Sequence, residues 1–464
     1  MKKSLLVVIV FLLMLTGCRT YYQREQEFHS YFRTGRLEEA AQALERSRDA
    51  SRGRNQLLHL LNQGVVQHML GNYAKSNDLF EQAFILGEDY RKDFMDEAIA
   101  LFSNPKMTEY RGEDFELLMV HYFKAMNFIQ LGDLDAALVE CRRLNIKLAA
   151  LEDKFTSENR YRRDAFIHNL MGIIYDASGD FNNSFIAYRN AYEIYRDDYT
   201  DLFGVSAPMQ LKYDLVRSAY RTGFSDLGRE YESLFGIQNP GNPSSGEGEL
   251  VFFWQNGLGP VKEEWSINFS IIRGAGGNVQ FVNEEMGLSF PFFSDGQSSG
   301  DLGDLRLVRV AFPKYVERSP VFTGARLVGS RQQVGLQLAQ DVNAIAFKSL
   351  EDRMLREMST ALLRLAVKQA SEQSLRSQDD RLGAVFSILG AVTEQADTRN
   401  WQTLPHSIHY ARMPLPEGEN QLELELLNAA QQVARRVPLE VTINAGRTTF
   451  RNFHTLDAKP LGAR

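Results

Sequence analysis

Along the first half of the chain, apolar and polar residues recur with the period of amphipathic helices, and short glycine-containing turns interrupt the pattern. Because glycine readily ends a helix, each turn predicts the end of one helix and the start of the next. The spacing of the turns is uneven, and an insert begins at Ser103-Asn104-Pro105-Lys106. We therefore expect antiparallel helix pairs over residues 18–236, with turns at Gly35, Gly71, Gly132, Gly179 and, in a degenerate fifth copy, Gly223.

Residues at fixed distances from these turns also recur. Seven positions before three of the turns stand the small residues Gly64, Ala125 and Gly172. Nine positions after four of the turns stand larger residues, namely Leu44, Phe80, Cys141 and Tyr188. Small residues allow two helices to approach closely, and large apolar ones fill the gap against the next pair. Cys141 is therefore predicted to be buried and unreactive.

This pattern resembles the tetratricopeptide repeat (TPR), in which such positions recur over about 34 residues. The resemblance implies a helical solenoid whose concave face is lined by the first helix of each pair. That face is mostly apolar, which suits an amphipathic helix or a hydrophobic peptide of a partner protein. The alternative is that the C-terminal half of the chain packs there. The residues predicted to form this partner-binding groove are Leu61, Val65, Tyr122, Met126, Asn169 and Ile173.

A stretch rich in proline, glycine and serine, 239–248, predicts a linker at residues 237–249. Beyond it, residues 250–464 change to strand-like runs that surround a helical section at about 341–395. We expect strands near 250–254, 266–271, 305–310, 324–328, 407–413, 421–427, 439–443 and 448–453. The predicted fold class is α+β multidomain, with an N-terminal α-helical TPR-like solenoid and a mixed, strand-rich C-terminal region that ends in a small antiparallel β-sandwich.

The N-terminus indicates where the protein resides. Two lysines precede an apolar run of about 11 residues, 5–15, which is too short for a bilayer-spanning helix of about 20 residues and suits a secretory signal at residues 1–17. Leu15-Thr16-Gly17-Cys18 resembles the lipobox of bacterial lipoproteins, which implies that Cys18 is acylated and becomes the new N-terminus. The alternatives are an ordinary signal peptide with an incidental cysteine, or a short buried helix. The resemblance implies a periplasm-facing protein, and Arg19 favours the outer membrane.

Composition and motifs narrow the chemistry. A net charge of −7 disfavours nucleic acid, and two cysteines do not suggest a zinc site. The glycine-rich stretches 257–262 and 274–277 do not complete a phosphate-binding pattern. His406 and His409 should point to opposite faces of a strand, where they cannot easily share a metal. We therefore predict no catalytic residue, metal or cofactor.

The most distinctive C-terminal segment is Ala396 to Pro405, which contains Asp397, Arg399 and Trp401. It is either an exposed recognition loop or a helix-to-strand junction in which Trp401 is packed. Together with Tyr110 to Glu116 and Gly257 to Lys262, it resembles a little-characterised family of bacterial repeat-containing lipoproteins. That resemblance covers most of the mature chain and implies no assigned activity.

We expect a lipid-anchored periplasmic scaffold or assembly factor that binds other envelope proteins through its repeats and is not an enzyme. The alternative is an envelope enzyme, or a regulator of cell-wall synthesis, that acts through the C-terminal domain.

Overall fold

The computed structural model describes residues 25–47, 52–92, 108–152, 161, 163–273, 279–292, 306–378 and 396–461. The predicted signal peptide and Cys18 lie outside the described residues. Within the described ranges, no helix has the length and apolar character needed to cross a membrane.

Helix pairs build the N-terminal half, and each predicted turn glycine lies between the two helices of a pair. All five have φ between 72° and 82°, the left-handed region that glycine adopts without strain. The first helix of each pair is α3 (Gln26–Arg33), α5 (Gln56–Met69), α8 (Asp114–Leu131), α10 (Ala165–Ala177) or α13 (Met209–Arg221). The second is α4 (Leu37–Arg46), α6 (Tyr73–Lys92), α9 (Leu134–Glu152), α11 (Phe181–Ile194) or α14 (Ser225–Phe235), and η1 (Gly53–Asn55), η3 (Tyr195–Tyr199) and α12 (Thr200–Phe203) are short connecting turns.

The second and fourth pairs share the same internal contacts. A Cβ atom added to Gly64 would lie 2.5 Å from the ring of Phe80, and one added to Gly172 would lie 2.4 Å from the ring of Tyr188. The aromatic residue of each second helix therefore requires the glycine of the first. In addition, Ser76 Oγ donates to the Gly64 carbonyl (2.8 Å) and Ser184 Oγ to that of Gly172 (2.9 Å).

The C-terminal half contains three four-stranded sheets. The first has the order β12-β1-β9-β8, with β12 parallel to β1 and the other neighbours antiparallel; the second is β11-β10-β6-β7 and the third β4-β3-β2-β5. The strands are β1 (Glu247–Asn256), β2 (Val261–Arg273), β3 (Val279–Asn283), β4 (Leu288–Phe292), β5 (Leu307–Val316), β6 (Gly324–Val328), β7 (Gln333–Gly335), β8 (Gln337–Asp341), β9 (Ser407–Pro416), β10 (Gly418–Leu427), β11 (Val433–Ile443) and β12 (Thr448–Thr455).

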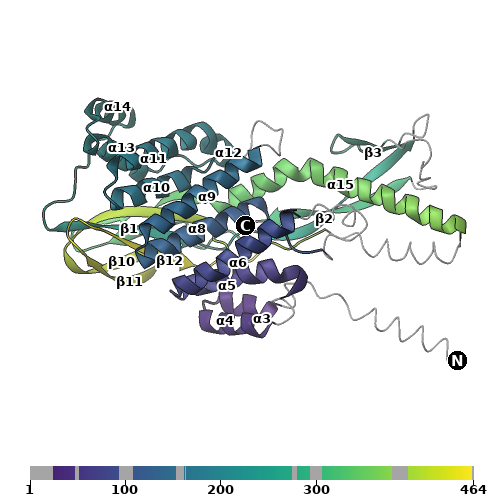
Figure 1. Cartoon of the computed structure of the whole chain (residues 1–464), viewed down its shortest axis with the longest axis horizontal. Coiled ribbons are helices and arrows are strands. Elements are labelled where there is room, and N and C mark those ends of the chain that lie inside the picture. Colours follow the sequence, from purple (N-terminus) through teal and green to yellow (C-terminus); the bar gives the residue numbers. More distant parts are fainter. Residues whose placement is uncertain are drawn as a thin grey trace.

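Sheet β12-β1-β9-β8 is the middle of three layers, between the helix pairs and the second sheet (Figure 1). Strand β1 is buried on both faces because Val251 and Phe253 point into the core shared with the helices, whereas Leu250 and Phe252 point towards the second sheet. The final strands do not form a small antiparallel sandwich of their own, as the sequence predicted: β9 and β12 join β1 and β8, β10 and β11 join β6 and β7, and β12 runs parallel to β1. The two halves share one hydrophobic core, so the linker does not separate two independent cores.

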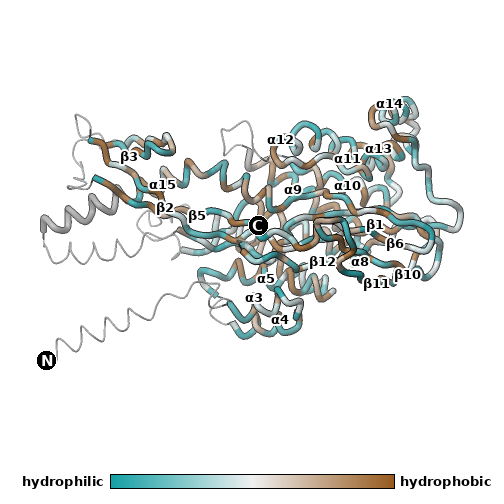
Figure 2. The backbone as a smooth tube through the Cα atoms, turned by 180° about the vertical axis from the view of Figure 1, so that it is seen from behind, coloured by the Kyte–Doolittle hydropathy of each residue, from teal (hydrophilic) through white to brown (hydrophobic). Residues whose placement is uncertain are grey.

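The third sheet and helix α15 (Val342–Gln378) form an arm that extends from one end of the molecule in both views (Figures 1 and 2). Its core contains Met358 and Leu362 of α15 against Phe269, Val310 and Phe312 of the sheet. The predicted helical section thus begins as expected, and its remainder, 379–395, lies outside the described residues.

Candidate functional site: a junction of three sequence motifs

The predicted groove is filled by the chain itself. Its six residues are at most 2% exposed: Leu61, Val65, Tyr122, Met126, Asn169 and Ile173. Gln255 of β1 donates a hydrogen bond of 2.9 Å to the hydroxyl of Tyr122, and the ring of Phe253 lies 6.4 Å from that of Phe166. An external partner therefore cannot bind in this groove in the structure. The apolar face of the repeats and that of the sheet exclude water from each other. This is the alternative in which the C-terminal half of the chain packs in the groove.

The segment 396–405 is largely buried, as in the alternative of a helix-to-strand junction in which Trp401 is packed, and it is not an exposed recognition loop. Trp401 is 1% exposed, and its ring lies 5.9 Å from that of Phe80 and 5.8 Å from that of Phe123. Its indole nitrogen donates to Thr403 Oγ1 (2.8 Å), which in turn donates to Asn62 Oδ1 (3.0 Å). Trp401 thus occupies a fitted aromatic pocket between the second and third pairs.

Arg399 holds the same segment to the start of the second pair. Its guanidinium donates to the carbonyls of Arg54 and Thr108 and to Asn55 Oδ1, at 3.1 to 3.2 Å. It is also bonded to Asp397 at 2.7 Å and lies 5.4 Å above the ring of Tyr110. With 6% exposure, Arg399 has nearly all its donors committed within the chain.

The three motifs singled out in the sequence meet at one place, which we call the motif junction: 110–116, 257–262 and 397–403. Glu116 accepts a hydrogen bond from the backbone nitrogen of Trp401 (2.6 Å). Asn400 donates to the Pro260 carbonyl at 2.8 Å, and Lys262 forms an ion pair with Glu113. The junction fastens the third helix pair, the base of the arm and segment 396–405 together.

The pKa values of two carboxylates of the junction are shifted in opposite directions. Glu113 caps α8 and is paired with Lys262 and with Arg353 of α15. Burial opposes its ionisation, but the Arg353 and Lys262 charges outweigh burial and lower the pKa of Glu113 to about 2. For Glu116, burial and the nearby Glu113 charge raise the pKa to about 7. Burial therefore favours the protonated form of Glu116, and both carboxylates are enclosed by partners of the same chain.

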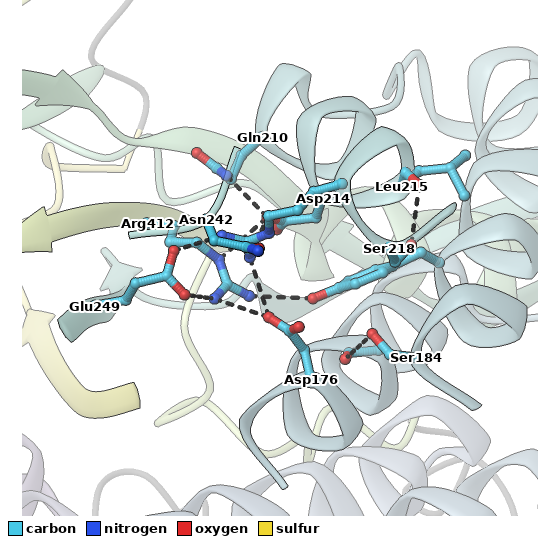
Figure 3. Close-up of polar contacts among 12 residues, drawn as sticks. Asp176, Ser184, Gln210, Asp214, Leu215, Ser218, Asn242, Glu249 and Arg412 are labelled. Atoms are coloured by element: carbon cyan, nitrogen blue, oxygen red, sulfur yellow. Dashed lines mark hydrogen bonds and ion pairs between the residues drawn. The ribbon is translucent and has the colours of Figure 1, made fainter. Parts of the chain in front are cut away.

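A second buried polar site, the arginine cluster, joins the last two helix pairs to the first sheet (Figure 3). Arg412 of β9 pairs with Glu249 (2.8 Å), Asp176 (3.1 Å) and Asp214 (3.1 Å). Arg217 of α13 pairs with the same three acids, at 2.5 to 3.2 Å. Burial opposes ionisation of Glu249, but both arginines lower its pKa to about 2, whereas burial raises the pKa of Asp214.

The remaining candidate residues do not converge on these sites. His406 pairs with Glu317 at 3.0 Å, and His409 contacts Ser407 at 3.1 Å. In the described ranges, histidine, cysteine and acidic residues do not gather in threes that could hold a metal ion. Cys141 is fully buried, and burial raises the pKa of its thiol.

No family model matches the chain, and no curated protein matches it. Several solved structures are similar to part of the chain. MamA protein is 14% identical over 45% of this chain and 86% of that chain (TM-score 0.30), and MamA 41-end from Desulfovibrio magneticus RS-1 is 17% identical over 45% and 88% (0.29). The putative kinesin light chain TPR-like repeats of Podosopora anserina are 14% identical over 45% and 90% (0.30).

At this level of similarity, the class of the protein rests on its own geometry. The helix pairs, their left-handed turn glycines and the repeated Gly64–Phe80 and Gly172–Tyr188 contacts define a TPR-like repeat block. Sheet β12-β1-β9-β8 packs against this block and shares its hydrophobic core.

Proposed function

We propose that this protein is a lipid-anchored scaffold of the bacterial envelope that binds other proteins through surfaces outside the concave groove. The observation that carries the proposal is the filled groove, because it makes the repeats and the C-terminal sheets one preassembled body. A binding role also fits the motif junction, because its charged side chains already have partners within the chain. Lys262 is paired with Glu113, and Glu116 accepts a hydrogen bond from Trp401.

The partner-binding surface that we favour is the outer face of the second helices. Ile85 of α6, Val139 and Ile146 of α9, and Ile186 of α11 are 42–68% exposed. These side chains stand on the second helices of successive repeats and offer apolar surface to a partner protein. The proposed partner is an envelope protein that covers these side chains.

Photo-crosslinking in cells tests this surface. A photoreactive phenylalanine analogue is placed at Ile146, which is 68% exposed, and in a matched control at Leu144, which is 2% exposed on the same helix. We expect a discrete adduct with another protein from position 146 and none from position 144. If positions 85, 139, 146 and 186 all fail to give an adduct, the proposed surface is wrong.

The location is tested separately. We propose that Cys18 is acylated and holds the body at a membrane, with the outer membrane favoured, because a buried acyl chain contributes roughly 0.8 kcal/mol per methylene. Lipid labelling and membrane fractionation of wild type and Cys18→Ser should show both label and membrane association lost in the variant. A variant that remains labelled and membrane-bound would contradict the anchor.

A further inference from the structure

A polar cavity of about 710 Å³ lies beside the linker that joins the two halves of the chain. The linker runs from α14 to β1 at the end of the molecule opposite the arm (Figure 1). Linker residues 242–246 and the start of β1 form one wall of the cavity, residues 176–179 and the end of α13 form another, and the β11–β12 turn forms a third. Because ligand pockets measure roughly 300–1,000 Å³, this cavity is large enough for a small molecule.

Arg221, at the end of α13, holds its guanidinium in one orientation in the cavity wall. Its Nη1 donates to Asp176 Oδ1 and its Nε donates to Asn242 Oδ1, both at 2.5 Å. The same guanidinium lies 4.9 Å from the centre of the Phe181 ring. Both hydrogen-bond acceptors lie beside the arginine cluster (Figure 3). Within the described ranges, Nη2 of Arg221 has no hydrogen-bond partner, so it can donate to a ligand.

Arg447 supplies a second guanidinium from the β11–β12 turn. The backbone nitrogen of Arg447 donates to the Asn444 carbonyl at 3.1 Å, which closes the turn. The backbone nitrogen of Gly446 donates to the Glu247 carbonyl at 2.8 Å, which fastens the turn to the start of β1. The Arg447 side chain is exposed and lines the cavity. Unlike Arg221, it forms no ion pair with a carboxylate in the part of the chain that the structure describes.

The acids next to the cavity are already matched by cations. The arginine cluster balances three arginines against three acids, namely Arg217, Arg221, Arg412, Asp176, Asp214 and Glu249. Glu247 is a further acid of the wall, and one of its carboxylate oxygens accepts a hydrogen bond from the backbone nitrogen of Ser244 at 3.0 Å. Arg447 is therefore a cation of the wall that is left available to an anionic ligand.

We propose that this cavity binds a small polar carboxylate, whose carboxylate group is held by the guanidinium of Arg447 and the Nη2 of Arg221. A guanidinium matches a carboxylate in shape as well as in charge, because its planar N–H groups can donate to both oxygens. Arg221 is fixed in place before the ligand arrives, so little side-chain freedom is lost there on binding. The proposal does not depend on the scaffold function.

The other groups of the wall favour a single carboxylate over a phosphate. Asp176, Glu247 and Glu249 all line the cavity, and their charges would repel a second negative charge on the ligand. Ser245 and Thr448 line it as well and supply hydroxyl groups that can bond to hydroxyl or amide groups of the ligand. A carboxylate with such neighbours is found at the free end of a peptide and in an acidic sugar.

Calorimetric titration of the full chain tests the site and separates the two sources. The carboxylate probes are N-acetyl-alanyl-alanine and N-acetylmuramic acid, and their neutral counterparts are the amide of the same dipeptide and N-acetylglucosamine. We expect at least one carboxylate probe to bind, about tenfold more tightly than its neutral counterpart, and the probe that binds identifies the source. Absence of binding by both carboxylate probes up to about 10 mM, or equal binding of the neutral counterparts, would overturn the proposal.

Substitutions connect the binding to the two arginines. Arg447→Gln should weaken binding of the carboxylate probe about tenfold and leave urea unfolding unchanged, because the side chain is exposed. Arg221→Lys keeps the charge but loses the planar fork, so it should weaken binding as well. The control Arg435→Gln removes an exposed arginine that is paired with Asp457 outside the cavity, and it should bind as wild type does. Unchanged binding in either cavity variant, or tighter binding of inorganic phosphate than of the carboxylate probes, would overturn the proposal.

Discussion

The two polar sites that hold the C-terminal half in the repeat groove are built differently. At the motif junction, Trp401 and Arg399 are bound largely through rings, backbone carbonyls and a backbone nitrogen, much as a peptide ligand would be. At the arginine cluster, Arg412 and Arg217 share three buried carboxylates, and Arg221 supplies a third cation, which is paired with Asp176. The first site depends on shape and hydrogen-bond direction, and the second on charge balance.

This difference determines how each site should respond to damage. Removing one ion from a balanced buried cluster leaves the others uncompensated, which costs more than the pair contributed. Removing an aromatic side chain leaves a cavity, which the neighbouring side chains partly fill. The predictions below separate the two mechanisms, from the largest expected effect to the smallest.

Arg412→Ala should lower the free energy of unfolding by about 4 kcal/mol, because Asp176, Asp214 and Glu249 lose one of the two arginines that they share inside the core. Urea unfolding followed by circular dichroism measures the loss. The control Arg435→Ala removes an exposed pair with Asp457, so it should cost less than about 1 kcal/mol. Equal losses of unfolding free energy in the two variants would show that the arginine cluster contributes no more to stability than an exposed ion pair.

Trp401→Ala should cost about 3 kcal/mol in the same urea assay, because it empties the pocket between Phe80 and Phe123. Trp401→Phe keeps an aromatic ring and loses the hydrogen bond to Thr403, so about 1 kcal/mol is expected. A Trp401→Ala protein as stable as wild type would mean that segment 396–405 is not seated in the groove.

Glu116→Gln should change how stability depends on pH. Because burial places the pKa of Glu116 at about 7 in the folded protein and 4.5 is its ordinary value, the stabilising protonated form is fully present below pH 4.5 and is lost as pH rises through 7. The stability of wild type minus that of Glu116→Gln should therefore fall by about 3 kcal/mol between pH 4.5 and pH 8. Unfolding of both proteins over this range measures the difference, in which the other titrating groups cancel.

Glu113→Gln supplies the opposite case. The pKa of Glu113 is lowered to about 2, so the contribution of its ionised form is present above pH 4.5 and is lost as pH falls towards 2. The free energy of unfolding of wild type minus that of Glu113→Gln should thus grow from pH 2 to pH 4.5. If the stability of Glu113→Gln and that of Glu116→Gln depend on pH in the same way, the opposite pKa shifts of the two carboxylates are wrong.

Ile146→Ser should have the smallest effect on stability, within about 0.5 kcal/mol, because the side chain is 68% exposed. Under the proposed function it should nevertheless reduce recovery of the crosslinked partner, which a competition crosslinking assay measures. A large loss of stability would show that this surface is part of the fold and not a free interface.

The sequence predicted local structure well, because helix pairs and strands leave periodic signals. The turns at Gly71 and Gly179 and the strands around 250–254 and 421–427 are present as expected, since apolar periodicity and glycine turns are local properties. The short strands β3, β4, β7 and β8 were not anticipated, although the five-residue β6 was, because three to five residues carry little periodicity.

Long-range contacts were harder to predict. The six predicted groove residues are buried, but what covers them depends on contacts across more than a hundred positions, such as Tyr122 with Gln255. Trp401 drew attention as an unusual residue, and only the fold reveals that it is buried. Arg217 and Arg412 gave no signal, because an isolated arginine on a helix or strand usually faces solvent.

The most direct test of the central claim, that the chain fills its own repeat groove, is site-specific crosslinking from Tyr122. p-Azidophenylalanine at this position puts the reactive group where the tyrosine hydroxyl meets Gln255. The account predicts an intramolecular product joined to the peptide that contains Gln255, at the same yield in purified protein and in cells. Adducts only with other proteins, and none with β1, would contradict it.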